Sequence, residues 1–152
     1  MRFVLFSFLL LTACQFHPLF GSKTTSNICV ASIPEAAGYQ LKQELKNYFN
    51  EEKNCQYTLK VKTPSVTMTD QSISNKDFIT TQKVSSFATY TLLDNKKQVL
   101  LQNTASANAS VAVVANPYSS VVATEKTTQN LIPLLAEQIA LHVTAFLDRN
   151  NE

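Results

Sequence analysis

Cys14 is the residue whose chemistry is indicated most clearly by its neighbours. It follows Leu11–Ala13 at the end of a short apolar segment, Phe3–Leu11, which begins behind the positive N-terminus Met1-Arg2. A positive start, an apolar stretch and small residues before the cleavage site are what a signal peptidase needs. The 11 residues before Cys14 that start at Phe3 are too few to span a bilayer as a helix, which takes about 20. The sequence therefore predicts a cleaved lipoprotein signal peptide over residues 1–13.

Cleavage would make Cys14 the first residue of a mature chain of 139 residues, that is 152 minus 13. We expect a thioether-linked diacylglycerol on its sulfur and an amide-linked acyl chain, such as palmitate, on its nitrogen. One acyl chain binds a bilayer only marginally and two signals bind it stably, so three chains would anchor the protein permanently. The alternative is an ordinary secretory signal followed by an incidental cysteine.

Residues 14–26 are expected to form a lipidated tether between the membrane and the domain. They show no sustained period and end in the polar stretch 21–26. The twelve residues after Cys14 reach about 40 Å at most when extended, so the domain would stay close to the membrane. Phe16, Leu19 and Phe20 are apolar enough to lie against the membrane, a partner or the core of the domain itself.

Cys29 and Cys55 are the two cysteines that remain once Cys14 is lipidated. An even pair in an exported chain favours a disulfide, because the periplasm is oxidising. The loop-entropy model assigns such a link roughly 3–4 kcal/mol. Two buried free thiols are the alternative. A metal or catalytic role is disfavoured because the only histidines, His17 and His142, are distant from both cysteines in sequence; His142 is expected to be a partly buried packing residue.

Charge and motifs exclude several classes of function. Without Arg2 the mature chain has 12 basic and 11 acidic residues, and no long basic run is present. Nucleic-acid binding is therefore unsupported. The two glycines, Gly21 and Gly38, cannot build a phosphate-binding loop, and no Gly-x-Ser-x-Gly, His-Glu-x-x-His or Cys-x-x-Cys motif occurs. We expect no enzyme, no metal and no cofactor apart from the covalent lipid.

A single domain is expected over residues 27–150, beginning with a strand and a helix. Asn27–Ile33 is a short apolar run with β-branched residues, which suits a buried strand. Pro34 and Glu35 then favour the first turn of a helix. Its apolar stripe recurs at spacings of three and four, at Ala37, Leu41, Leu45, Tyr48 and Phe49.

The middle of the chain is rich in strand patterns. Tyr57, Leu59 and Val61 alternate with polar residues, and Pro64 limits this strand. A further strand between 77 and 93 has apolar residues on both parities, which indicates a bulge or bend. The polar break at 94–97 predicts a hairpin turn to the next strand, 101–111. Its small residues Ala105, Ala107 and Ala109 would let a helix approach closely.

Residues 116–120 break that strand and supply hydroxyls suited to helix capping, and the chain then has a helical pattern nearly to its end. Pro133 is expected to bend this helix or mark its effective restart. Its predicted apolar face contains Leu131, Leu134, Leu135, Ile139, His142, Val143, Phe146 and Leu147. The expected fold class is α+β: a two-layer sandwich in the order β-α-β-β-β-α, with about four strands and two helices on one face.

Several stretches of the chain resemble a known family in the same order. Ala13–Gly21 resembles the Cys-Gly-Phe-x-Pro-Leu-Tyr-Gly opening of the alphaproteobacterial lipopolysaccharide-assembly lipoproteins, the LptE family. Ile33–Leu45 resembles the family's strand-to-helix junction, and Phe87–Leu92 resembles its third strand. The stretch Ser110–Phe146 resembles its serine-tyrosine turn and terminal helix. Together these segments span nearly the whole mature chain.

The resemblance implies a non-enzymatic outer-membrane lipoprotein on the periplasmic face. Such proteins act as plug and assembly partner of LptD, the large β-barrel that inserts lipopolysaccharide. Family members also contact lipopolysaccharide, and basic residues here that could meet its phosphates are Lys60, Lys62, Lys83, Lys96 and Lys97. Exposed lysines also protect strand edges against pairing with other chains, so these five residues could instead be ordinary solvated surface residues.

Two other classes of function remain open from the sequence. A free-standing periplasmic lipid-binding or transporter-auxiliary lipoprotein would need an apolar cavity between sheet and helices. An envelope enzyme would need a pocket with perturbed carboxylates or histidines. The alanines of the last strand favour close packing over a cavity.

Overall fold

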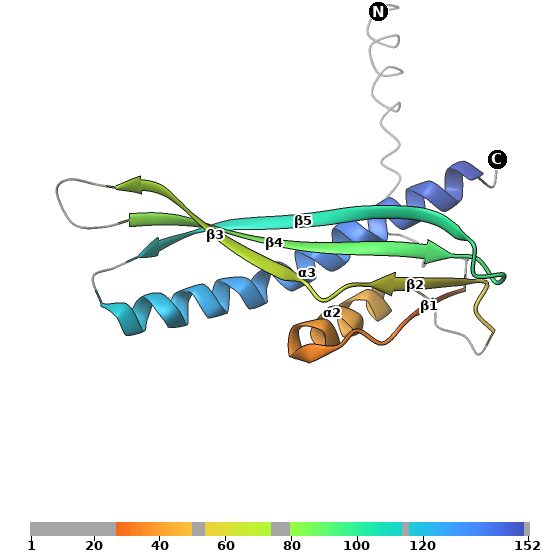
Figure 1. Cartoon of the computed structure of the whole chain (residues 1–152), viewed down its shortest axis with the longest axis horizontal. Coiled ribbons are helices and arrows are strands. Elements are labelled where there is room, and N and C mark those ends of the chain that lie inside the picture. The colour runs from red at the N-terminus through yellow and green to blue at the C-terminus, as the bar shows by residue number, and fades with distance from the viewer. Residues whose placement is uncertain (1–26, 50–53, 74–79, 114–115, 151–152) are drawn as a thin grey trace, which may run out of the picture.

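The computed structural model describes residues 27–49, 54–73, 80–113 and 116–150. The predicted signal peptide, Cys14 and the tether lie outside the described residues. The described residues form five strands and two helices, and both helices pack on the same face of one sheet (Figure 1). The elements in order are β1 (Ile28–Val30), α2 (Glu35–Tyr48), β2 (Tyr57–Val61), β3 (Ser65–Ile73), β4 (Thr80–Leu93), β5 (Val99–Val113) and α3 (Pro117–Asn150). The predicted α+β sandwich is confirmed, with one strand more than expected.

Strand β4 lies at the centre of the sheet. It pairs with β5 along its whole length, and its other edge is shared by β3, antiparallel to its first half, and β2, antiparallel to its end. β1 lies parallel to β2 at the outside of this edge. The predicted hairpin between β4 and β5 is confirmed, and one Asp94 carboxylate oxygen accepts the backbone N–H groups of Lys96 and Gln98 at 2.9 and 2.7 Å.

Strand β3 was not predicted from the sequence. Its residues are mostly polar; Val66, Met68 and Asp70 lie on the inner face, and Val66 and Met68 are 37% and 54% exposed. Pairing with the long β4, and not its own hydrophobicity, therefore holds it in the sheet. The β4–β5 ladder has a register shift at Leu92/Leu93, within the region where a bulge was expected. At Phe87 itself the pairing is regular, opposite Ser106, and its side chain is half-buried on the outer face of the sheet.

Helix α2 confirms the predicted amphipathic stripe. Leu41 and Leu45 are fully buried and Phe49, just after the helix, is nearly so. Gly38 is buried in the same stripe because the helix passes close to Ile33: a Cβ at Gly38 would lie 2.6 Å from Ile33 Cγ2. A side chain at this position would prevent that approach.

Helix α3 runs unbroken through Pro133 for 34 residues. Asn116 caps it, since its side-chain oxygen accepts the backbone N–H of Tyr118 at 3.0 Å and Pro117 occupies the first helical position. The cap is thus the amide of Asn116 and not one of the expected hydroxyls. Of the described helices, α3 is the one whose length and composition would allow it to cross a membrane, and 44% of that stretch is buried inside the protein.

The core lies under the second half of α3. Eight residues of α3 from Leu131 onward are buried against the sheet and α2: Leu131, Ile132, Leu135, Ala136, Ile139, Ala140, Val143 and Leu147. Ala105 and Ala107 of β5 are buried below them, which confirms that small residues let the helix approach. Two predicted members of the buried face are wrong: Leu134 is 47% exposed, and His142 is exposed rather than partly buried. Leu134 lies near Ser106 and Asn108 of the edge strand β5, whereas His142 lies against the hydroxyl of Tyr90.

Candidate functional site

An open groove separates the first half of α3 from the inner face of the sheet. Its volume is about 960 Å³. The start of α2 closes one side, β3 and the start of β4 form the floor, and α3 forms the opposite wall. The lining residues are Ala36, Ala37, Gln40, Val66, Met68, Gln82, Ser120, Val121, Thr124, Glu125, Thr128, Gln129 and Ile132.

The groove exists because the side chains of α3 become short before Leu131. Val121, Thr124, Thr128 and Ile132 recur at helical spacing on the wall that faces the sheet. The corresponding positions further along the helix are Leu135, Ile139 and Val143, which fill the space to the sheet. Threonine cannot span the same gap, so the first half of the helix stands above the sheet without closing on it.

Some polar side chains of the groove have partners within the protein. Thr128 Oγ1 donates to the carbonyl oxygen of Thr124 at 2.9 Å, one turn earlier in its own helix. At the far end of the floor, Gln82 Nε2 donates to Asp70 Oδ1 at 2.8 Å. These two groups are therefore engaged within the protein, while Gln40, Glu125 and Gln129 also line the groove.

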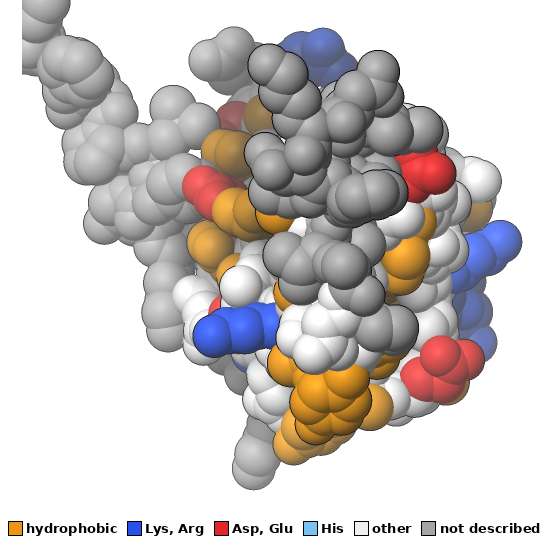
Figure 2. Space-filling view, turned by 90° about the vertical axis from the view of Figure 1, so that its left-hand side faces the viewer, with side chains coloured by type: hydrophobic (Ala, Val, Ile, Leu, Met, Phe, Trp, Pro, Cys, Tyr) orange, Lys and Arg blue, Asp and Glu red, His pale blue; other side chains and the backbone are white. Residues whose placement is uncertain are grey.

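Exposed hydrophobic side chains surround the mouth of the groove. Tyr118, Val121 and Val122 at the start of α3 are 78%, 65% and 46% exposed, and Met68 on the floor is 54% exposed. Hydrophobic side chains gather on the lower part of this end of the molecule (Figure 2). Contiguous apolar surface of this kind marks a binding region more often than scattered single residues do.

Two buried polar residues of β4 lie near the groove: Ser86 is beside its floor, and Tyr90 is further along the strand. Ser86 is buried on the inner face of β4, beside Val66 of the floor, and its hydroxyl has no hydrogen-bond partner among the described residues. Tyr90 is fully buried, and its hydroxyl lies 2.9 Å from His142 Nδ1. Burial raises the pKa of Tyr90 to about 12, partly opposed by a hydrogen bond with the Asn103 side chain. The exposed imidazole of His142 thus anchors a core tyrosine.

The five predicted lysines lie away from the groove. Register places Lys60 and Lys83 on the outer face of the sheet, opposite Thr91 and Ser110 respectively, and Lys62 continues the same face beyond β2. Lys62 lies beside Thr89, because its backbone N–H donates to the Thr89 carbonyl oxygen. Thr89 is six residues from Lys83 along β4, so Lys62 and Lys83 are about 20 Å apart.

Lys96 and Lys97 occupy the β4–β5 turn, where Lys97 has a left-handed backbone with φ 64°. The five therefore form separate groups: Lys60 and Lys62 at one place on the outer face, Lys83 about 20 Å away along β4, and Lys96 and Lys97 in the turn. The structure does not gather the lysines into one cluster.

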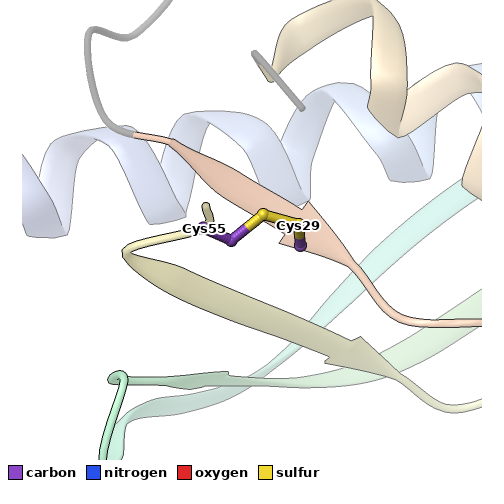
Figure 3. The surroundings of a disulfide bond; sticks show 2 residues. All are labelled: Cys29 and Cys55. Carbon is purple, nitrogen blue, oxygen red and sulfur yellow. A yellow bond between two sulfur atoms is a disulfide. The ribbon is translucent and has the colours of Figure 1, made fainter. Parts of the chain in front are cut away.

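Cys29 and Cys55 form a disulfide, as the sequence favoured (Figure 3). Cys29 lies in β1, Cys55 lies two residues before β2, and their Cα atoms are 5.5 Å apart. The bond fixes β1, a strand of three residues, to the sheet at the outer edge of β2. Within the described residues no group of three or more His, Cys, Asp or Glu side chains could hold a metal ion.

Comparisons with known proteins show the fold. No family model matches the sequence, and no curated protein matches it. The chain is similar to a solution structure of uncharacterized lipoprotein B from Nitrosomonas europaea, with 13% identity, a TM-score of 0.61 and coverage of 81% of this chain and 84% of that one.

Two crystal structures agree with this likeness. Rare lipoprotein B from Shewanella oneidensis gives 10% identity and a TM-score of 0.61, over 82% of this chain and 96% of that one. A minor lipoprotein from Acinetobacter baumannii gives 19% identity and a TM-score of 0.59, over 79% and 91%. These structural neighbours are all lipoproteins, and identities at this level show a shared fold.

Proposed function

We propose that the protein is an outer-membrane lipoprotein, anchored through Cys14 on the periplasmic face, that acts as plug and assembly partner of an LptD-type β-barrel in lipopolysaccharide transport. The observation that carries the proposal is agreement between two independent signals. The N-terminus has the pattern of a lipoprotein signal, and the fold of the described domain is similar over most of its length to solved lipoproteins, among them rare lipoprotein B. The resemblance of Ala13–Gly21 and Ser110–Phe146 to the LptE family supplies the barrel partner.

The outer face of the sheet supports a place inside a barrel. No helix of the described chain covers this face, and β4 and β5 present mainly hydroxyl and amide side chains there: Thr81, Ser85, Thr89, Thr91, Gln102, Thr104, Ser106, Asn108 and Ser110. The lumen of a large transmembrane barrel is polar and wet. A polar sheet face can lie against such a lumen without leaving apolar surface in water.

Lipopolysaccharide contact belongs to the same proposal. Lys60, Lys62 and Lys83 lie on this outer face, and Lys96 and Lys97 lie at the tip of the β4–β5 hairpin. Ammonium groups bind phosphate as point charges, so these residues are candidates for the phosphates of the lipid headgroup. The proposed role is non-enzymatic and uses no metal or cofactor beyond the covalent lipid.

The proposal is tested by affinity purification from detergent-solubilised envelopes through a tag placed after Glu152. We expect a large β-barrel protein to co-purify in near-equal amount. A matched variant, Cys14→Ser, separates anchoring from partner binding, because it removes the lipid and leaves the domain unchanged. Absence of a barrel from the lipidated protein would remove the main support for the plug role.

The groove favours one second candidate, a free-standing periplasmic lipid-binding lipoprotein. Its volume of about 960 Å³ lies within the usual range of ligand pockets, roughly 300–1,000 Å³, and most of the surface that lines it is apolar. Mass spectrometry of organic extracts from the purified protein distinguishes the two candidates. Stoichiometric lipid without a barrel partner would favour this second role.

A further inference from the structure

The β4–β5 hairpin ends in an exposed tip, residues 95–100, where two lysines stand beside two apolar side chains. Val99 and Leu100 are 59% and 37% exposed, and Lys96 and Lys97 are exposed in the turn. The register shift in the β4–β5 ladder makes Leu100 an extra residue of β5. Two consecutive apolar side chains are therefore exposed, where regular alternation would place one of them on the inner face.

The charges of the hairpin tip favour an anionic partner. The carboxylate of Asp94 is turned back into the loop, because one of its oxygens accepts the backbone N–H groups of Lys96 and Gln98. Lys97 has φ 64°, a conformation in which glycine is usual at this place in a hairpin, and an outlier of this kind supports a functional role. Exposed ammonium groups beside apolar side chains are the combination that binds the interface of an anionic bilayer.

The chain that leads to the predicted lipid on Cys14 leaves the domain beside this tip. The carbonyl oxygen of Asn27, the first described residue, accepts the backbone N–H of Tyr57 at 3.1 Å. The next residue of β2, Thr58, pairs with Leu93, the last residue of β4 before the turn. Asn27 is therefore about two strand spacings, roughly 10 Å, from the start of the turn. A lipid anchor would hold the membrane at this end of the domain.

The groove end, which also exposes apolar side chains, is less suited to an anionic bilayer. Met68 on the groove floor pairs with Val84, about ten β4 residues and 33 Å from the level of Asn27. The start of α3, with Tyr118, lies at the end of the sheet opposite the hairpin (Figure 1). No lysine or arginine lines the groove, whereas Glu125 does. The hairpin tip has both the nearer position and the favourable charge.

We propose that the hairpin tip docks on a bilayer of anionic phospholipid, with Val99 and Leu100 in the interface and Lys96 and Lys97 beside lipid phosphates. Each lysine near an anionic surface strengthens binding by about fivefold. Phosphate is also the group that lipopolysaccharide would offer these lysines, and phospholipid is assigned here because it would surround the anchor. The proposal rests on the lipid anchor of the proposed function and does not involve the barrel. Docking would direct the groove end away from the bilayer.

Tryptophan fluorescence of the full lipidated protein tests the proposal, because the chain contains no tryptophan. Val99→Trp reports on the hairpin tip, and Tyr118→Trp, an aromatic exchange at a residue that is 78% exposed, reports on the groove end. Each variant is reconstituted into vesicles of phosphatidylcholine and phosphatidylglycerol whose acyl chains carry bromine, which quenches a nearby indole. We expect the emission of Val99→Trp to be quenched at least about twofold relative to vesicles without bromine, and that of Tyr118→Trp to be unchanged.

A matched pair of charge reversals tests the role of the lysines. Lys96→Glu in the Val99→Trp protein should remove most of the quenching, as should replacing phosphatidylglycerol by phosphatidylcholine. Lys126→Glu makes the same charge change on an exposed residue of α3 near the groove and should leave the quenching as it was. Equal effects of the two reversals would overturn the assignment of lipid phosphates to the hairpin.

The remaining outcomes separate this proposal from its rivals. Equal quenching of Val99→Trp and Tyr118→Trp, or stronger quenching at Tyr118, would overturn it, and Leu100→Trp repeats the measurement if Val99→Trp fails to fold. Quenching that appears only when lipopolysaccharide is added to the vesicles would also overturn it and would assign the tip to that lipid. Flotation with the vesicles reports on the anchor: a chain that does not float refutes the anchor and this proposal together, whereas one that floats without quenching refutes the docking alone.

Discussion

Gly38→Ala is the substitution for which local and tertiary arguments disagree most clearly. In an isolated helix, replacing an interior glycine by alanine stabilises by about 1 kcal/mol. In this protein the added Cβ would lie 2.6 Å from Ile33 Cγ2, 3.1 Å from Ile33 Cβ and 3.2 Å from the Ile33 carbonyl carbon. None of these atoms is the end of a flexible side chain, because isoleucine is branched at Cβ and stiff about χ1.

The magnitude follows from these two terms. Overpacking a close contact costs about 1–3 kcal/mol, and contact with a stiff side chain and the backbone points to the upper part of that range. After the gain in helix propensity, we expect Gly38→Ala to lower the free energy of unfolding by about 1–2 kcal/mol and Tm by about 3–8 °C. Urea unfolding followed by circular dichroism, with the Cys29–Cys55 bond intact, measures the change.

A double-mutant cycle identifies the cause. Ile33→Ala alone removes a buried side chain and is expected to cost about 2–5 kcal/mol. Combined with Gly38→Ala, it also removes the Cγ2 methyl that the new Cβ would meet, so the double variant should be about 1–2 kcal/mol more stable than the sum of the single effects. An alanine at position 38 that raises the unfolding midpoint would refute the close approach of α2 to Ile33.

Four further outcomes are expected. Ser86→Ala should stabilise the protein by about 1 kcal/mol in urea unfolding, since it removes a buried hydroxyl without a partner among the described residues; a loss of stability would show that the hydroxyl is bonded. Tyr90 ionises near pH 10 when unfolded and near 12 when folded, so its contribution to stability is complete below pH 10 and is lost between pH 10 and 12; Tyr90→Phe should flatten melting temperatures across that window. Reducing the disulfide should lower the free energy of unfolding by roughly 3–4 kcal/mol, and an unchanged urea midpoint would contradict this. Cells fed radiolabelled palmitate should label the protein but not its Cys14→Ser variant.

The spacing of apolar residues predicted the buried face correctly in helices and strands that have one face against the core. The helix beginning after Pro34, the strand containing Leu59 and Val61, and the alanine positions of β5 all have the predicted buried face. In each case a single face meets a single core, so the period of apolar residues fixes which side is inside.

Positions at the edge of a contact were predicted less well. Leu134 and His142 follow the helical period of α3, yet both are exposed: Leu134 lies beside the edge strand β5, and His142 contacts the hydroxyl of Tyr90 without being covered. Strand β3 was missed because its pairing with β4 leaves few of its side chains in the core. The spacing of apolar residues records neither the width of the neighbouring layer nor the strength of backbone pairing.

By itself the sequence determined the lipoprotein signal pattern at Cys14, the pairing preference of Cys29 and Cys55, and the class of fold, since each depends on residue type and short spacing. Only the tertiary structure decided that α3 leaves the sheet before Leu131 and opens a groove over Val66 and Met68. The reason is physical: the distance between two packed layers is set by side chains that face each other from segments far apart in the chain, and no local pattern contains both sides of that contact.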